Sequence, residues 1–329
     1  MNLYTVSGMV GFCIDTIKLF LSWEGIEDDF DYERFAKKTN SRVNDRGRYK
    51  EWSKGYYKNF RINYNPEYGI SLIGSISNFV KGKLKLLSYV ELKDGIEMLG
   101  QELGLNLHEA KIKRIDLALN IVTEENVEVY SKMLFLDLSR FKRFEQDTGI
   151  RFESKQIQIV IYNKQKELKE KSNLFVDENL LRIEFRVIKR ISNHFGIKEM
   201  IVNNLYEVDN YLKLLDKFKS NFLKIKVLKS LGSIEEVGNI TPRDLSKCLQ
   251  TIGAFCLEKS SGNVFDIIEG WDKQGKFKYP NSKARCRALF KELLTSKDLD
   301  KAHPLVDEIK KKVIESFQKE VKDVKERSI

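Results

Sequence analysis

The stretch QIQIVIYNK, residues 156–164, alternates apolar and polar side chains, which is typical of a β-strand with one buried face. KIKRIDLALNIV at 111–122 and LLRIEFRVIK at 180–189 have the same alternation. Because successive side chains of a strand point to opposite faces, we expect each strand to bury its apolar face in a common core. These faces are Ile115, Leu117, Leu119 and Ile121; Ile157, Ile159 and Ile161; and Leu181, Ile183, Phe185 and Val187.

The opposite faces of the same three strands are polar. They carry Arg114, Asp116 and Asn120; Gln158, Tyr162 and Lys164; and Arg182, Glu184 and Arg186. If the strands are neighbours in one sheet, a single surface gathers two carboxylates, a tyrosine and several cations. Carboxylates are disfavoured inside strands unless something pairs with them. Two explanations stay open: salt bridges on a solvated face, with Glu184 between Arg182 and Arg186, or a divalent cation held by the carboxylates.

The composition favours a polyanionic partner. The 58 Lys and Arg residues exceed the 48 Asp and Glu residues, which gives a net charge of +10. Because of this positive charge, we expect nucleic acid as the partner. We expect no membrane, because no apolar run approaches the ~18 residues of a membrane span. The four cysteines form no CxxC pair, which indicates a reduced, cytoplasmic protein. They are Cys13, Cys248, Cys256 and Cys286.

The metal explanation implies a chemistry. With only three histidines in the chain, a metal would be held mainly by carboxylates, and Mg²⁺ or Mn²⁺ prefers such oxygen ligands. An ion on Asp116 and Glu184 would polarise a phosphodiester, and a tyrosine phenolate is a suitable nucleophile. Lys164, two residues beyond Tyr162, is placed to favour ionisation of the phenol. Asp15 is either a further ligand or a hydrogen-bonding residue of its strand.

At these residues the sequence resembles rolling-circle replication initiators, most of all the gene II and gene X type replication proteins of filamentous phages and related plasmid proteins. The matching stretches are RIDLALN (114–120), VIYNKQKEL (160–168) and LLRIEFRVIKR (180–190), with DTIKLFL (15–21) and LIGSISNFVKGK (72–83) as further similar segments. The resemblance implies that Asp116 and Glu184 are metal ligands and that Tyr162 is the nicking tyrosine. Plasmid relatives often have an aspartate where this chain has Asn120, and no segment resembles the His-hydrophobe-His motif of the larger superfamily.

A second group of candidate residues lies in RGRYKEWSKGYYKNFRINY, residues 46–64, where cations alternate with aromatic rings. Cations for phosphates and rings for stacking are the features that bind unpaired bases, although an ordinary hairpin with solvated lysines explains the pattern equally well. The candidate DNA-binding residues are Arg46, Arg48, Trp52, Lys54, Tyr57, Lys58 and Arg61, together with Arg114, Arg182 and Arg186 on the strands.

The order of predicted elements indicates an α+β fold with an antiparallel sheet and flanking helices, followed by a smaller all-helical part. We expect a nicking endonuclease domain at 1–226 and a helical accessory domain at 227–329. The expected elements include a strand at 11–21, a hairpin with its turn at Asn65-Pro66, a helix ending near Gly104, and a helix capped by Thr123. A long helix at 197–226 and helices at 243–258, 283–294 and 304–325 complete the prediction.

The leading hypothesis is a tyrosine-nucleophile DNA endonuclease that initiates rolling-circle replication, leaves a 5′-phosphotyrosyl link and frees a 3′-OH. A non-catalytic nucleic-acid-binding protein and a relaxase or transposase of a mobile element are the alternatives. The expected partner is single-stranded or hairpin origin DNA. A host helicase and a second copy of the chain are further candidate partners.

Overall fold

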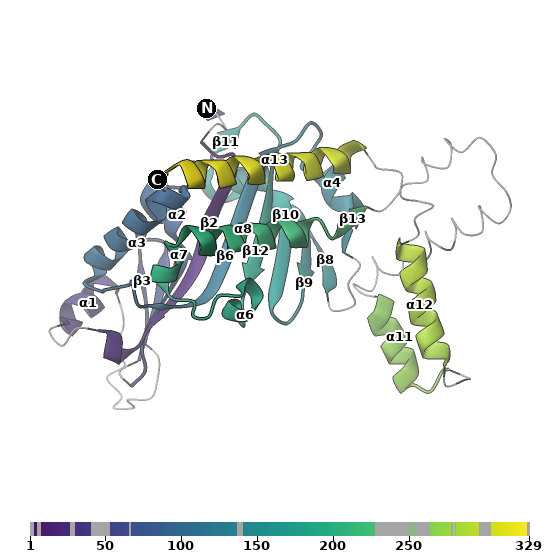
Figure 1. Ribbon diagram of the computed structural model, residues 1–329, viewed down its shortest axis with the longest axis horizontal. Coiled ribbons are helices and arrows are strands. Elements are labelled where there is room, and N and C mark those ends of the chain that lie inside the picture. The colour runs from purple at the N-terminus through teal and green to yellow at the C-terminus, as the bar shows by residue number, and fades with distance from the viewer. Residues whose placement is uncertain are drawn as a thin grey trace.

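A nine-stranded antiparallel sheet organises the protein, as the computed structural model shows (Figure 1). The structure describes residues 3–4, 8–26, 30–40, 53–65, 67–136, 141–227, 264–277, 281–295 and 304–327, and the single residues Gln250, Gly253 and Tyr279. From one edge to the other the strands are β3 (Ser53–Tyr57), β4 (Phe60–Asn65), β5 (Gly69–Ser75), β2 (Gly11–Leu21), β6 (Lys111–Val122), β12 (Leu180–Val187), β10 (Ile157–Asn163), β9 (Gly149–Glu153) and β8 (Lys142–Gln146). The predicted α+β class with an antiparallel sheet is confirmed.

The three strands with alternating sequences are neighbours, with β12 between β6 and β10. In register, Arg182 of β12 lies opposite Asn120 of β6 on one side and Tyr162 of β10 on the other. All of the predicted apolar residues of the three strands are buried and belong to the main core. The sequence alternation therefore gave the correct inward face for each strand.

Helices cover that inward face. Figure 1 shows α8 (Val208–Phe222) and α13 (Pro304–Arg327) crossing in front of the strands. With α3 (Tyr89–Leu103), both helices contact β2 or β6. The remaining helices of this part of the chain are α1 (Tyr32–Lys38), α2 (Ile76–Lys81), α4 (Val127–Met133), α5 (Lys164–Ser172), α6 (Ile191–Phe195) and α7 (Val202–Leu205). Within the described ranges, no helix combines the length and apolar character that crossing a membrane requires.

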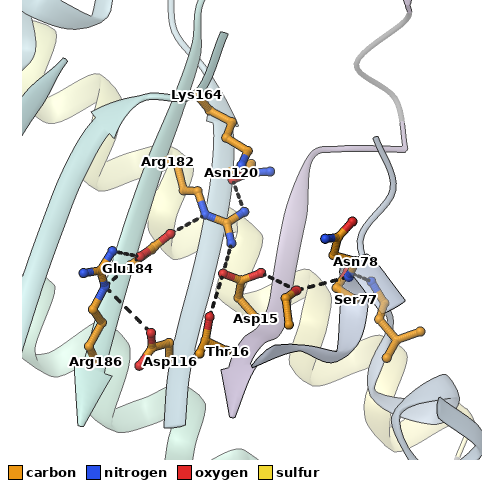
Figure 2. Close-up of polar contacts among 12 residues, drawn as sticks. Asp15, Thr16, Ser77, Asn78, Asp116, Asn120, Lys164, Arg182, Glu184 and Arg186 are labelled. Atoms are coloured by element: carbon orange, nitrogen blue, oxygen red, sulfur yellow. Dashed lines mark hydrogen bonds and ion pairs between the residues drawn. The ribbon is translucent and has the colours of Figure 1, made fainter. Parts of the chain in front are cut away.

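Strand β2 contains a bulge that matters for the site. Its pairing with β6 shifts register between Ile14 and Ile17, so the apolar side chains change from even positions (Phe12, Ile14) to odd ones (Ile17, Leu19). A bulge inserts one extra residue and re-aims the side chains beside it. Asp15, within the bulge, consequently points to the polar face of the sheet (Figure 2).

Several local predictions are confirmed and others need correction. Strand 11–21 and the hairpin at Asn65 are present, and the Asn65 side chain accepts the backbone N–H groups that close the turn. Gly104 ends α3 at φ +69°, which favours glycine. The cap of α4 is Asn126 and not Thr123, because the Asn126 side chain accepts the N–H of Glu128.

The predicted long helix at 197–226 is instead α7, α8 and the short strand β13 (Ile225–Val227), which pairs with β7 (Leu134–Leu136). The strand predicted at 156–164 ends one residue earlier, so Lys164 begins α5. Two small elements, β1 (Leu3–Tyr4) and β11 (Phe175–Val176), pair in parallel, and a 3-10 turn spans Trp23–Gly25. Apart from Gln250 and Gly253, the predicted helix at 243–258 lies outside the described residues.

Helix α13 belongs to the core of the sheet. Val306, Ile309, Val313 and Val324 are buried among residues of the first two thirds of the chain. The predicted domain boundary at residue 226 would therefore place α13 in a different domain from the core in which its side chains are buried. By contrast, α11 (Val264–Lys273) and α12 (Ser282–Thr295) pack on each other around Phe265 and Ile268 and stand to one side in Figure 1.

We predict that Ile309→Ala lowers the free energy of unfolding by about 2–5 kcal/mol, because it removes a fully buried side chain from the core. Lys311→Ala, on the same helix and 77% exposed, is the control and should change stability by less than about 0.5 kcal/mol. Urea denaturation measures both. Equal stability of the two variants would show that α13 adds nothing to the core.

Candidate functional site

The guanidinium group of Arg182 is the centre of a buried polar network on the face of the sheet opposite α13 (Figure 2). Its Nε donates to Glu184 Oε1 at 2.8 Å, Nη1 donates to Asn120 Oδ1 at 3.1 Å, and Nη2 lies 3.0 Å from Asp15 Oδ2. Arg182 is only 3% exposed. A buried guanidinium needs such partners, and here they come from β2, β6 and β12.

Glu184 joins the tyrosine to the arginines. Its Oε1 also accepts a hydrogen bond of 2.8 Å from the Tyr162 hydroxyl, and its Oε2 accepts two from Arg186, at 2.8 and 2.5 Å. Burial alone would raise the pKa of Glu184, but the positive charges of Arg182 and Arg186 outweigh it and lower the pKa to about 2. Glu184 is therefore an anion held between two cations.

Asp116 is the second buried carboxylate. Arg114 donates to both of its oxygens, at 2.8 and 2.5 Å, and Arg186 Nε lies 3.8 Å from Oδ2. Burial outweighs the opposing effect of Arg114 and raises the pKa of Asp116 to about 6. Arg186 thus bridges the two carboxylates predicted as metal ligands.

Tyr162 is neutral in this arrangement. Burial, assisted by the negative charge of Glu184, raises its pKa well above the ordinary value, although Arg182 opposes the shift. Lys164, expected to help the phenol ionise, instead donates to Glu167 Oε2 at 2.5 Å from the first turn of α5. The cation that favours the phenolate is Arg182, opposite Tyr162 in register.

The carboxylate oxygens of Asp116 and Glu184 can bind a divalent cation only if the arginine side chains that now occupy them move away. All four oxygens of Asp116 and Glu184 accept hydrogen bonds, mainly from guanidinium groups. In the described part of the chain, no three His, Cys, Asp or Glu side chains cluster so as to hold a metal. The side chains of Arg114 and Arg186 are 28% and 25% exposed and can withdraw into solvent. Their withdrawal would leave three carboxylate oxygens for Mg²⁺ or Mn²⁺, both of Asp116 and Oε2 of Glu184.

The predicted DNA-binding hairpin is not part of this network. Lys54, Tyr57, Lys58 and Arg61 lie on or between β3 and β4, and β3 is six strand positions from β10 in the sheet, about 29 Å at ordinary strand spacing. Tyr57 and Lys58 both hydrogen-bond to Glu102. Arg46, Arg48 and Trp52 lie outside the described residues.

A basic pocket beside the network has no counterpart in the sequence prediction of the site. The loop after α2 supplies Lys83 and Lys85, and α5 supplies Lys164 and Lys171. The sequence distinguishes segment 72–83 only by its resemblance to the family, and nothing local to the segment indicates that α5 lies opposite it. The sequence left Asp15 as either a metal ligand or a hydrogen-bonding residue. Its carboxylate accepts a hydrogen bond of 2.9 Å from the Ser75 hydroxyl and forms an ion pair with Arg182.

No protein-family model matches the chain, and no curated protein is significantly similar to it. Among solved structures, a similar chain is the rolling circle replication initiator protein from Geobacillus stearothermophilus. It is 12% identical, the similarity covers 67% of this chain and 87% of that chain, and the TM-score is 0.38. Neither this identity nor this TM-score establishes a shared family.

We predict that Arg182→Ala destabilises the fold by about 3–5 kcal/mol, since it leaves Glu184 and Asp15 with less compensation at a buried position. Arg151→Ala is the matched control, because Arg151 pairs with Glu153 on β9 and both side chains are about a third exposed. The control should lose at most about 1 kcal/mol. Thermal or urea unfolding that shows equal losses would contradict a central role for Arg182.

Proposed function

We propose that the protein nicks one DNA strand to initiate rolling-circle replication, with Tyr162 as the nucleophile. The observation that supports this most is the register of β6, β12 and β10. It gathers Asp116, Glu184 and Tyr162, the residues of the three family-like motifs, into one connected polar network. The excess of positive charge in the chain suits a DNA substrate.

In the proposed reaction, the Tyr162 oxygen attacks phosphorus and the bond from phosphorus to the 3′ oxygen breaks. The Tyr162 hydroxyl, which donates to Glu184 Oε1 at 2.8 Å, loses its proton to solvent, and the positive charge of Arg182 favours the resulting phenolate. The leaving 3′ oxygen takes a proton from solvent. The products are a 5′-phosphotyrosyl link and a free 3′-OH. Since the bond energy is kept in the phosphotyrosyl link, the same site can rejoin the strand.

The three arginines have different roles in this proposal. Arg182 is buried and keeps Glu184 and Asp15 in place. Arg114 and Arg186 are partly exposed and can turn from the carboxylates to the phosphate oxygens, which guanidinium groups bind in a bidentate manner. Asp116 and Glu184 would then hold Mg²⁺ or Mn²⁺, which supplies charge stabilisation for the phosphoryl group.

A second candidate function is non-catalytic nucleic-acid binding. The observation that favours it is the saturation of both carboxylates by arginine, which satisfies the buried charges without a metal. The two candidates differ in whether divalent metal and a tyrosine hydroxyl are needed for strand cleavage.

Tyr162→Phe should abolish nicking while leaving DNA affinity near the wild-type value, because it removes one oxygen and affinity comes mainly from phosphate contacts. The substrate is a pool of 3′-labelled single-stranded oligonucleotides with Mg²⁺ or Mn²⁺, and the readout is a denaturant-resistant protein–DNA adduct. Peptide mapping should place the label within residues 157–171. Tyr130→Phe, which removes a hydroxyl that also donates to a glutamate, is the control and should nick normally. An adduct on another tyrosine, or nicking without an adduct, would contradict the assignment.

Arg186→Ala should raise the affinity for Mn²⁺ about tenfold, the equivalent of about 1.4 kcal/mol, because Arg186 competes for both carboxylates. Asp116→Asn and Glu184→Gln should each remove Mn²⁺ binding and nicking. Electron paramagnetic resonance of Mn²⁺ without DNA measures binding directly. Glu153→Gln, a carboxylate on β9 outside the network, is the control. Unchanged Mn²⁺ affinity in Asp116→Asn would show that this residue is not a ligand.

A further inference from the structure

A pocket of about 190 Å³ opens on the polar face next to the arginine network. Its floor includes Arg182 and Asn120, both buried, so the pocket and the proposed active site share a wall. The α2 side contributes Ser77, Asn78 and the loop 82–86, and α5 forms the opposite side. Figure 2 shows Asn78, Asn120, Lys164 and Arg182 around this region of the sheet.

Among the charged side chains that line the pocket, cations outnumber carboxylates. Lys83, Lys85, Lys164, Lys171 and Arg182 line it, against the carboxylates of Asp15 and Glu167. Glu167 is already shared between Lys164 and Lys171, at 2.5 and 3.0 Å. Lys83 Nζ reaches across to Ser172 Oγ at 2.8 Å, from the loop after α2 to the end of α5. The excess of positive charge indicates an anionic ligand.

One side of the same pocket is apolar. Met9 and Leu168 are buried and form a small cluster with Val176 and Leu180, against which Leu84 packs. Asn78 lines the pocket from α2, and among the described residues its side-chain amide has no hydrogen-bond partner. An apolar wall, an amide free to pair and a cationic rim are together suited to a base attached to a phosphate.

The volume limits how much can enter. Pockets for drug-sized ligands begin at about 300 Å³, so this space takes a single base or phosphate and not a stacked dinucleotide. Arg182 touches the pocket and lies opposite Tyr162 in register, so a nucleotide held there is adjacent to the proposed nucleophile.

We propose that this pocket binds one unpaired nucleotide of single-stranded DNA next to the phosphate that Tyr162 attacks. The base packs on Leu84, the partly exposed side chain of the apolar side, Asn78 pairs with its edge, and Lys83 and Lys171 bind the flanking phosphates. This proposal rests on the proposed function for the identity of the strand, but the binding it predicts can be measured without cleavage.

The test measures fluorescence anisotropy of a labelled oligothymidylate with the full chain carrying Tyr162→Phe, without divalent metal, so that no cleavage occurs. Lys83→Ala combined with Lys171→Ala should raise the Kd at least tenfold and reduce the slope of log K against log salt by about 1.4, for two single-strand phosphate contacts. Lys171 is 72% exposed, so the fold should not change. Lys169→Ala, an exposed lysine of α5 outside the pocket, is the matched control and should bind as the parent does.

A second variant separates base from phosphate recognition. Asn78→Ala should weaken binding of oligothymidylate severalfold and leave binding of an abasic oligonucleotide of the same length unchanged. If the double lysine variant binds the oligonucleotide as tightly as the parent, the proposal that the pocket binds a nucleotide is wrong. The proposal that Tyr162 nicks DNA would not be affected by this result. Competition by free thymidine monophosphate as effective as the oligonucleotide would also overturn the pocket proposal, as would tighter binding of oligouridylate. Loss of pocket-dependent binding and loss of nicking are thus observed in separate assays.

Discussion

Burial of the Arg182 guanidinium is the constraint on which the polar face of the sheet depends. A cation that is 3% exposed must be neutralised, and its partners come from three strands that are far apart in sequence. The bulge in β2 supplies Asp15, β6 supplies Asn120, and β12 supplies Glu184. Satisfying this one group therefore favours the observed register of β12 against β6, together with burial of the apolar faces, and helps to orient the side chains that surround Tyr162.

The same network determines what chemistry the face can carry out. Glu184 is held as an anion by two arginines, whereas Asp116 has a pKa raised to about 6 by burial despite its arginine partner. The partly exposed Arg114 and Arg186 are the groups that can exchange carboxylate for phosphate partners. In the proposed function, arrival of DNA and access of metal are consequently linked, because both depend on the same two side chains.

The two faces of the sheet have different roles: one packs against helices and forms the core, and the other carries the polar network. Helices α3, α8 and α13 cover the apolar side of the strands, which leaves the other side for ionic groups and for the pocket (Figures 1 and 2). Helix α13, from the last part of the sequence, returns to the sheet and completes that cover. The stability of the strands that carry the site therefore depends on a segment distant from it in sequence.

The sequence by itself determined which side chains of each strand point inward, because alternation is a local property of the extended backbone. It predicted that Tyr162, Glu184 and Asp116 share one face. The β2 bulge was not predicted, although the apolar positions change from even to odd after Ile14. Only the tertiary structure decided that Arg182 and not Lys164 lies beside Tyr162, that the β3–β4 hairpin is at the far edge, that α13 packs on the sheet, and that α5 faces the loop after α2. These features depend on strand order and on contacts between distant segments, where many local patterns compete and the summed free energy of packing and charge pairing selects one arrangement.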